Sequence, residues 1–200
     1  MLTEAHRLAQ SAIGRAVLAE LGEDLLSDAV VDLALEARGK SDAVAARYYA
    51  AFRQAEGIAD GFVLGEADPL APATARERIA DAANRFGQGP GEVVRVVLGG
   101  GRDRLARSLG ADSRAIGWQR VCSSSCCSFC AMLAGRGAVY RSARAAGDGR
   151  GYHRSCACTV EPVFRRGTPL PARSQVFADL YDEAGSFDAF KVAFRERAEA

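Results

Sequence analysis

Over the first sixty positions, apolar residues recur among polar ones at the spacing of amphipathic helices. Residues 2–21 form the first predicted helix, with apolar positions at Leu8, Ile13, Val17 and Leu21. A second helix is predicted over residues 25–37, because Gly39 is a helix stop signal. A third begins at the capping residue Ser41, runs to about residue 56 and ends at Gly57. Its aromatic residues are spaced as one buried face: Tyr48, Tyr49 and Phe52.

A loop containing Pro and Gly over residues 65–72 precedes the next predicted helix, at residues 74–86. A short apolar helix follows over residues 92–98, and the three glycines at 99–101 break it before another helix at 102–109. No Gly-Lys-Ser/Thr follows this glycine run and no strand precedes it, so a phosphate-binding loop is disfavoured. We interpret the glycines as a hinge or helix break.

From Ile116 onward the pattern changes to short strands, predicted over residues 116–122, 137–140 and 156–164, with a Gly-rich loop at 147–151. After Pro171 the pattern returns to an amphipathic helix or helix pair with core aromatics at Phe177, Tyr181, Phe187, Phe190 and Phe194. The predicted fold class is therefore α+β. A mostly helical region (1–110) is followed by a small Cys/His module (111–166) and a C-terminal helical tail (167–200).

The composition is that of a globular protein, with 48% hydrophobic and 26% charged residues among 200. The apolar stretches fall short of the roughly 20 residues that a membrane span needs. The first residues lack the basic-then-apolar order of a signal peptide. We therefore expect folding in a reducing cytoplasm, where cysteines bind metals more often than they form disulfides.

Charge is distributed unevenly along the chain. The formal net charge is +1, yet residues 102–173 hold thirteen arginines against four acidic residues, a net of +9. Such a block could form a basic face that meets nucleic acid or an acidic protein surface. It could equally be a solvated surface, since neither interleaved aromatics nor a dense arginine run supports specific nucleic-acid recognition.

Two clusters of metal-type ligands lie within the module. Cys127 and Cys130 have the spacing of a zinc knuckle, and His153, Cys156 and Cys158 follow after twenty-two residues. Five candidates for four tetrahedral positions leave one spare, with Cys127 and Cys130 the firmest. We interpret Cys122 and Cys126 as non-ligating, because neither has a partner at comparable spacing. A structural zinc ion suits a module with too few residues for a large core.

Three other uses of these residues stay open. Cys127 or Cys130 could form disulfides with Cys156 or Cys158 in an oxidising compartment. A catalytic cysteine with His153 as base would need an orienting acid and an oxyanion hole, which nothing in the sequence marks. Hydrolytic zinc would need an open coordination position and a nearby base, for which Glu161 is the nearest glutamate. A closed, structural zinc site is favoured.

The order of these motifs resembles the MuF-type minor head proteins of tailed phages, in the version common in phages of actinobacteria. The resemblance runs from about residue 114 to 164: Ile-Gly-Trp-Gln-Arg-Val at 116–121, Cys-Ser-Phe-Cys at 127–130, and the segment from His153 to Phe164. The chain departs from the wider family at Cys126, where Pro is frequent, and at Ala157, where Arg is frequent. The resemblance implies metal positions at Cys127, Cys130, His153, Cys156 and Cys158.

The resemblance also implies a non-enzymatic minor capsid protein that assists head assembly, DNA packaging or DNA ejection. The expected partners are the portal protein and other head proteins, with packaged DNA as a further candidate and no membrane. The expected location is the head interior near the portal, after assembly in the host cytoplasm. The alternative is a zinc-dependent nucleic-acid-binding protein or nuclease. A nuclease would need a catalytic histidine, and only His6 remains once His153 binds the metal.

Overall fold

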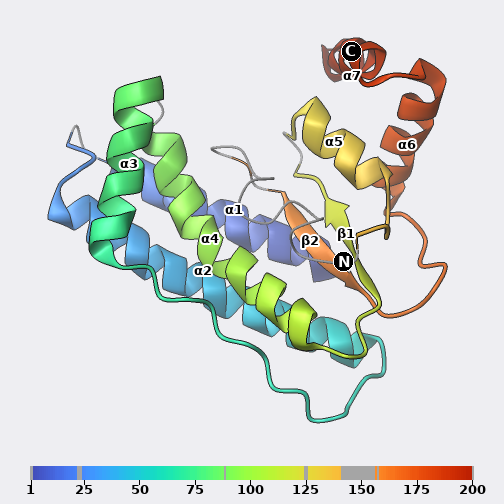
Figure 1. Cartoon of the computed structure of the whole chain (residues 1–200), viewed down its shortest axis with the longest axis horizontal. Coiled ribbons are helices and arrows are strands. Elements are labelled where there is room, and N and C mark those ends of the chain that lie inside the picture. Colours follow the sequence, from blue (N-terminus) through green and yellow to red (C-terminus); the bar gives the residue numbers. More distant parts are fainter. Residues whose placement is uncertain are drawn as a thin grey trace.

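Three long helices form the body of the protein. In the computed structural model, the described residues are 2–21, 24–87, 89–123, 126–140, 156 and 158–199. α1 (Leu2–Glu20), α2 (Asp28–Ala55) and α4 (Gly89–Ala111) pack as a bundle, and α3 (Pro72–Phe86) packs on one end of α4 (Figure 1). With the two-stranded sheet that follows, these helices confirm the α+β class. No helix among the described residues has the length and hydropathy to cross a bilayer.

α2 is one continuous helix where the sequence predicted two. Gly39 lies on its exposed side with open space around its Cα, so it does not end the helix. Ser41 is fully buried in mid-helix and is not a cap. Its hydroxyl donates to Gln10 Oε1 at 2.6 Å and accepts from the Gly101 amide at 3.0 Å, which joins α1, α2 and α4. Tertiary packing therefore overrides the local stop signals.

The glycine run at 99–101 lies inside α4 and does not break it, so the predicted hinge is wrong. These glycines let α4 approach α2 closely. A Cβ at Gly100 would fall inside van der Waals contact of the Arg38 carbonyl oxygen and 2.9 Å from Arg38 Cγ. A Cβ at Gly101 would lie 2.9 Å from the Ser41 carbonyl oxygen. The absence of side chains at residues 99–101 of α4 is therefore required for close packing against α2.

The buried face of α1 is mostly polar near its start, unlike the predicted apolar stripe. Val17 is buried and Ile13 packs against the bundle core as expected, but Leu8 is half-exposed. The inward positions of the first turns are instead Thr3, His6, Arg7 and Gln10. They face hydrogen-bonding partners, as in the contact of Thr3 Oγ1 with Tyr48 Oη at 3.0 Å. Polar partners in the fold explain this reversal.

The sheet pairs β1 (Gly117–Val121) with β2 (Thr159–Val163) in antiparallel register, with Gln119 opposite Glu161. Both strands were predicted. The third predicted strand, at residues 137–140, is reduced to a single bridge between Tyr140 and Trp118. At the zinc-knuckle spacing of Cys127 and Cys130, the structure has the short helix α5 (Ser128–Gly135), which the sequence pattern did not predict. The predicted loop at 147–151 lies outside the described residues.

A hydrophobic cluster joins the bundle to the sheet. Tyr48 and Tyr49 are buried, as predicted, and pack with Trp118, Leu133 and Val160. The predicted boundary near residue 110 is therefore crossed by a shared core, while the division into three domains stays a prediction.

Two C-terminal helices complete the chain: α6 (Ala172–Ala184) and α7 (Phe187–Glu199). They lie with α5 at the end of the molecule opposite α3 (Figure 1). Their aromatic side chains form core contacts as predicted, with Phe177 and Phe190 buried against the cysteines of the module. This end of the molecule is thus built around thiols and aromatic rings.

Several arginines of the basic block pair with acidic residues of the helical region. Arg104 makes a two-pronged contact with Asp42 at 2.6 and 2.7 Å. Arg107 pairs with Asp68, and Arg165 contacts Glu56 at 2.9 Å. The pairing also runs the other way, since Asp103 and Asp112 of the block bind Arg38 and Arg53. The uneven charge along the sequence therefore becomes, at these positions, a set of intramolecular ion pairs.

Candidate metal centre

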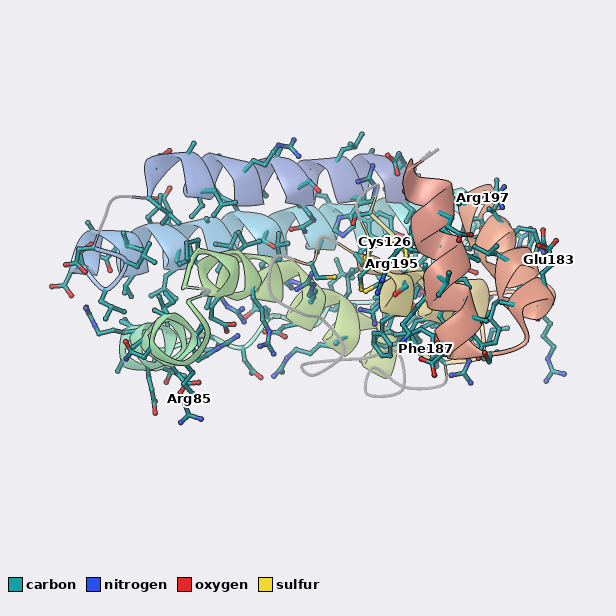
Figure 2. The ribbon with its side chains drawn as sticks, turned by 90° about the horizontal axis from the view of Figure 1, so that it is seen from above. Arg85, Cys126, Glu183, Phe187, Arg195 and Arg197 are labelled. Atoms are coloured by element: carbon teal, nitrogen blue, oxygen red, sulfur yellow. The ribbon has the colours of Figure 1, made fainter. Side chains whose placement is uncertain are left out.

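All six cysteines gather where β1 ends, α5 begins and β2 starts. The antiparallel register pairs Val121 with Thr159, so one step further it brings Cys122 opposite Cys158. The Cys126 amide donates to the Ser123 carbonyl oxygen at 3.2 Å, which turns the chain back toward the sheet. Figure 2 shows Cys126 at the α5–α7 end of the molecule, far from Arg85 on α3. All six are free thiols.

Three of the cysteines form a compact set. The sulfurs of Cys130, Cys156 and Cys158 all lie within 4.8 Å of one another, and all three residues are buried. The Cys130 and Cys156 sulfurs are 3.8 Å apart. A tetrahedral zinc ion with Zn–S bonds of about 2.3 Å separates its sulfur ligands by about 3.8 Å. The Cys130–Cys156 distance therefore matches that between two zinc-bound thiolates, and Cys158 lies close enough to be a third ligand.

The compact set of three does not account for the other two predicted ligands, Cys127 and His153. Cys127 is the half-buried N-cap of α5, and its thiol hydrogen-bonds with Cys130. It lies at the cluster but outside the compact set of three. His153 lies outside the described residues. The sequence also placed Cys156 and Cys158 on a strand, whereas both precede β2. The full five-residue ligand set stays a prediction.

Cys122 and Cys126, which the sequence interpretation set aside, are both buried in this cluster. Each donates a thiol hydrogen bond to the Cys158 sulfur. Motif spacing alone cannot reveal them, because they form no Cys-x-x-Cys pair with each other. The signal that could have found Cys122 is the strand pairing, since an antiparallel arrangement of residues 116–122 and 156–164 places the two cysteine-bearing ends together.

The pKa of Cys158 is lowered, whereas the pKa values of Cys122, Cys126, Cys130 and Cys156 are raised. Hydrogen bonds from Cys122, then Cys126, Cys130 and Cys156, hold the pKa of Cys158 far below its usual range despite burial. The pKa of Cys130 is raised, because its hydrogen bond with Cys127 and those with Cys156 and Cys158 favour its protonated form. Binding a metal ion here would release the thiol protons of the ligands, because the thiolate is the metal-binding form.

Backbone and arginine groups support the cluster from outside. The Ser123 amide donates to the Cys158 sulfur at 3.4 Å. Arg102 donates to the carbonyl oxygens of Cys156 and Cys158. Arg173 donates to the Ser123 carbonyl oxygen at 2.9 Å. These contacts fix the segments that carry the sulfurs and place positive charge beside developing thiolates.

His6 reaches this neighbourhood from a distant part of the sequence. It borders a small cavity that Cys158, Thr159 and Arg102 also line. Its ring stacks on Tyr48 with centroids 4.3 Å apart, and its Nε2 lies 3.4 Å from Thr159 Oγ1. Burial lowers the pKa of His6 to about 4, so the ring is neutral at pH 7. It connects α1 to the start of β2.

The fold and site define a helical protein whose small β-containing module is organised around a buried, metal-competent cysteine cluster. The family model described as VG15 protein matches residues 3–184, which include α1 to α6 and every cysteine. The chain belongs to this family, which is a family of phage proteins. Searches of curated proteins and of solved structures gave no match.

Proposed function

We propose that this protein is a minor head component of a tailed phage, of the MuF type, and that it acts without catalysis. It associates with the portal and other head proteins in the head interior and assists head assembly, DNA packaging or ejection. Its module holds structural zinc. Membership of a phage family supports the setting, and the motif order of residues 114–164 supports the MuF assignment.

The observation that carries the structural role is the burial of the cysteine cluster. Cys130 and Cys156 lie beneath α6 and α7, with Phe177 and Phe190 packed on the same cluster. Catalytic zinc keeps an open position for water or substrate, whereas structural zinc is closed by protein ligands. A metal enclosed by thiols and aromatic rings contributes to folding.

The nuclease alternative is disfavoured by the surroundings of two features that it requires, exposed arginines and a catalytic histidine. Arg104 and Arg165 of the basic block are engaged with Asp42 and Glu56. His6 is buried against Tyr48, away from any substrate in solution. A histidine with a pKa of about 4 in a stacked, enclosed position is a poor general base for a phosphodiester.

The direct test is coexpression of the tagged full chain with the portal protein encoded by the same phage genome. We expect the two to copurify, and we expect the chain in purified heads by mass spectrometry. As a matched control, the distant surface variant Arg85→Ser on α3 should be retained with the portal. Failure to bind portal together with absence from heads would overturn the assignment.

A second measurement distinguishes the proposed head protein from the alternative, a nucleic-acid-binding protein or nuclease. DNA affinity determined over a range of salt concentrations should be weak and should fall with salt only shallowly, because arginines such as Arg104, Arg107 and Arg165 are engaged in intramolecular ion pairs. Tight binding with a steep slope, or metal-dependent DNA cleavage abolished by His153→Ala, would favour the nucleic-acid protein instead.

A further inference from the structure

A cleft of about 690 Å³ lies between the start of α1, the end of α2, the sheet and the segment before α6. This volume is in the range of ligand-binding sites in proteins. Its apolar walls include Phe52, Phe164 and Leu170, together with prolines of β2 and of the segment before α6. Cys122 is the only cysteine among the residues that line it, so the cleft is largely separate from the candidate metal centre.

Glu161 and Gln119 form a cross-strand pair that lines this cleft. They lie opposite each other in the sheet register, and Gln119 Nε2 donates to Glu161 Oε1 at 2.7 Å. Thr3 donates to the other carboxylate oxygen of Glu161. Because the Thr3 hydroxyl has only one proton, its contact with Tyr48 is donated by the Tyr48 hydroxyl. Burial, and then the charge of Glu161, raise the pKa of Tyr48 well above its usual value, which keeps that donor protonated. Neutral donors therefore fix the orientation of the Glu161 carboxylate.

Two requirements of this pair are not met by the part of the chain that the structure describes. Glu161 has hydrogen-bond donors but no ion-pair partner there, since both of its donors are neutral. Gln119 is 1% exposed, and its Oε1 accepts no hydrogen bond from the described residues. A buried acceptor without a donor costs free energy. The pair therefore suits a ligand that supplies both a positive charge and several N–H donors.

The other charged groups of the cleft are already engaged. Glu4 pairs with Arg7 in the first turns of α1. Glu56 accepts from Arg165 at 2.9 Å. Arg173 donates to a backbone carbonyl oxygen of the segment after β1. The carboxylate of the cross-strand pair is thus the one at which a cation from outside the described chain would bind.

We propose that this cleft binds an arginine side chain carried by a segment of a partner protein. A guanidinium group has the charge that Glu161 lacks, and its N–H donors lie in one plane, where they can reach both the carboxylate and Gln119 Oε1. A lysine ammonium group has the charge without this planar set of donors. Phe52 and Phe164 line the same cleft, and guanidinium groups stack on aromatic rings. The apolar walls beyond the cross-strand pair accommodate the residues that flank the arginine, which favours a protein segment over a free guanidine.

This inference goes beyond the proposed role in the phage head and does not depend on it. Arginine binding at the cleft can fail while portal binding and zinc content stand, and the reverse also holds. The two sets of experiments therefore have separate outcomes.

The test is an NMR titration of the ¹⁵N-labelled full-length protein with capped tripeptides that carry arginine, lysine or citrulline between two leucines. Citrulline has the shape of arginine without its charge. We expect the arginine peptide to shift the side-chain NH₂ signals of Gln119 and the backbone amide signal of Thr3. The lysine peptide should bind more weakly. The citrulline peptide should bind at least about tenfold more weakly, because hydrogen bonds to a charged group are lost.

Two variants locate the binding site. Glu161→Gln should weaken binding of the arginine peptide at least about tenfold, because it removes the charge that the guanidinium group meets. The matched control is Glu56→Gln in the same cleft, where Arg165 already occupies the carboxylate, and it should change the affinity by less than about twofold.

The comparison of the peptides is made on the wild-type protein, so it decides the matter even if Glu161→Gln fails to fold. No shift at Gln119 with the arginine peptide, or equal affinity for the arginine and citrulline peptides, overturns the inference. N-butylguanidinium binding as tightly as the arginine peptide also overturns it, since the site would then serve a free guanidine. A concentration-dependent dimer that Glu161→Gln abolishes would assign the arginine to a second copy of this chain and overturn the partner protein.

Discussion

The helical bundle and the cysteine module are built on different kinds of core. The bundle packs Val, Ala and Leu side chains from α1 to α4, with glycines where α4 meets α2. The module has two five-residue strands and an eight-residue helix, and its interior includes six cysteines. Long helices bury enough apolar surface to be stable together, whereas short elements need an additional constraint. One chain thus combines a bundle stabilised by apolar packing with a small module that the proposed metal would stabilise.

Metal removal should affect the cysteine module far more than the helical bundle. Chelation under reducing conditions withdraws on the order of 10 kcal/mol of binding free energy from the module. We expect the amides of β1 and α5 to lose hydrogen-exchange protection while those at the centre of α2 and α4 keep theirs. Uniform loss of protection would show that the bundle also depends on the metal, and unchanged protection would show that the module does not.

The bundle should be most sensitive at its glycine contact. Gly100→Ala forces a methyl group against the backbone of Arg38, so α2 and α4 must separate. We expect a loss of about 3 kcal/mol in the free energy of unfolding, measured by urea denaturation. The matched control is Gly110→Ala, on the same helix with open space around it, which should leave stability unchanged or raise it by up to about 1 kcal/mol. Equal effects would refute close helix packing as the reason for these glycines.

The junction between the two regions should respond to pH through His6. Its pKa is about 4 in the folded protein, below the usual 6.5, so the unfolded chain takes up the proton first. Stability is therefore complete above about pH 6.5 and falls as the pH drops toward 4, by about 1.4 kcal/mol per unit. At pH 4.5 the loss should be about 2.5 kcal/mol. His6→Gln should remove the contribution of His6, so the free energy of unfolding of the variant should depend less steeply on pH than that of the wild type. Parallel pH dependences of the two proteins would contradict the role of His6.

The smallest expected effect is a gain in the free energy of unfolding. Gly39→Ala lies on the exposed side of α2, where nothing opposes a methyl group. Alanine favours the helix over glycine by about 0.5–1 kcal/mol, so the urea midpoint should rise slightly with no change in slope. A loss of stability would indicate that α2 needs a flexible point at Gly39, as the sequence had suggested.

Local patterns in the sequence predicted the fold where side-chain periodicity decides the structure. The helix at residues 2–21, the two strands and the aromatic pair of C-terminal helices follow from such patterns. Errors arose at Gly39 and at residues 99–101, where a residue that weakens an isolated helix is retained for helix-to-helix contact. α5 was missed because the cysteine spacing of residues 127–130 was interpreted as a zinc knuckle, although a helix N-terminus also brings two such thiols together.

The candidate metal site was predictable only where the spacing of residues along the sequence determines it. Spacing identified Cys130, Cys156 and Cys158, which the structure brings together. Spacing could not identify Cys126, because its contact with Cys158 depends on the turn after β1. Nor could it place His6 at Thr159, a contact across 153 positions of sequence.

The contacts of α1 with the sheet constrain how the protein is made. Thr3 donates to Glu161, a residue 158 positions later in the chain. At a synthesis rate of 5–20 residues per second, roughly 8 to 30 s pass between the emergence of the two from the ribosome. During that interval the polar face of the first helix can meet Ser41 and Tyr48 of α2, but Glu161 and Thr159 do not yet exist. The earliest segment of the nascent chain therefore completes its native contacts only after β2 has been synthesised.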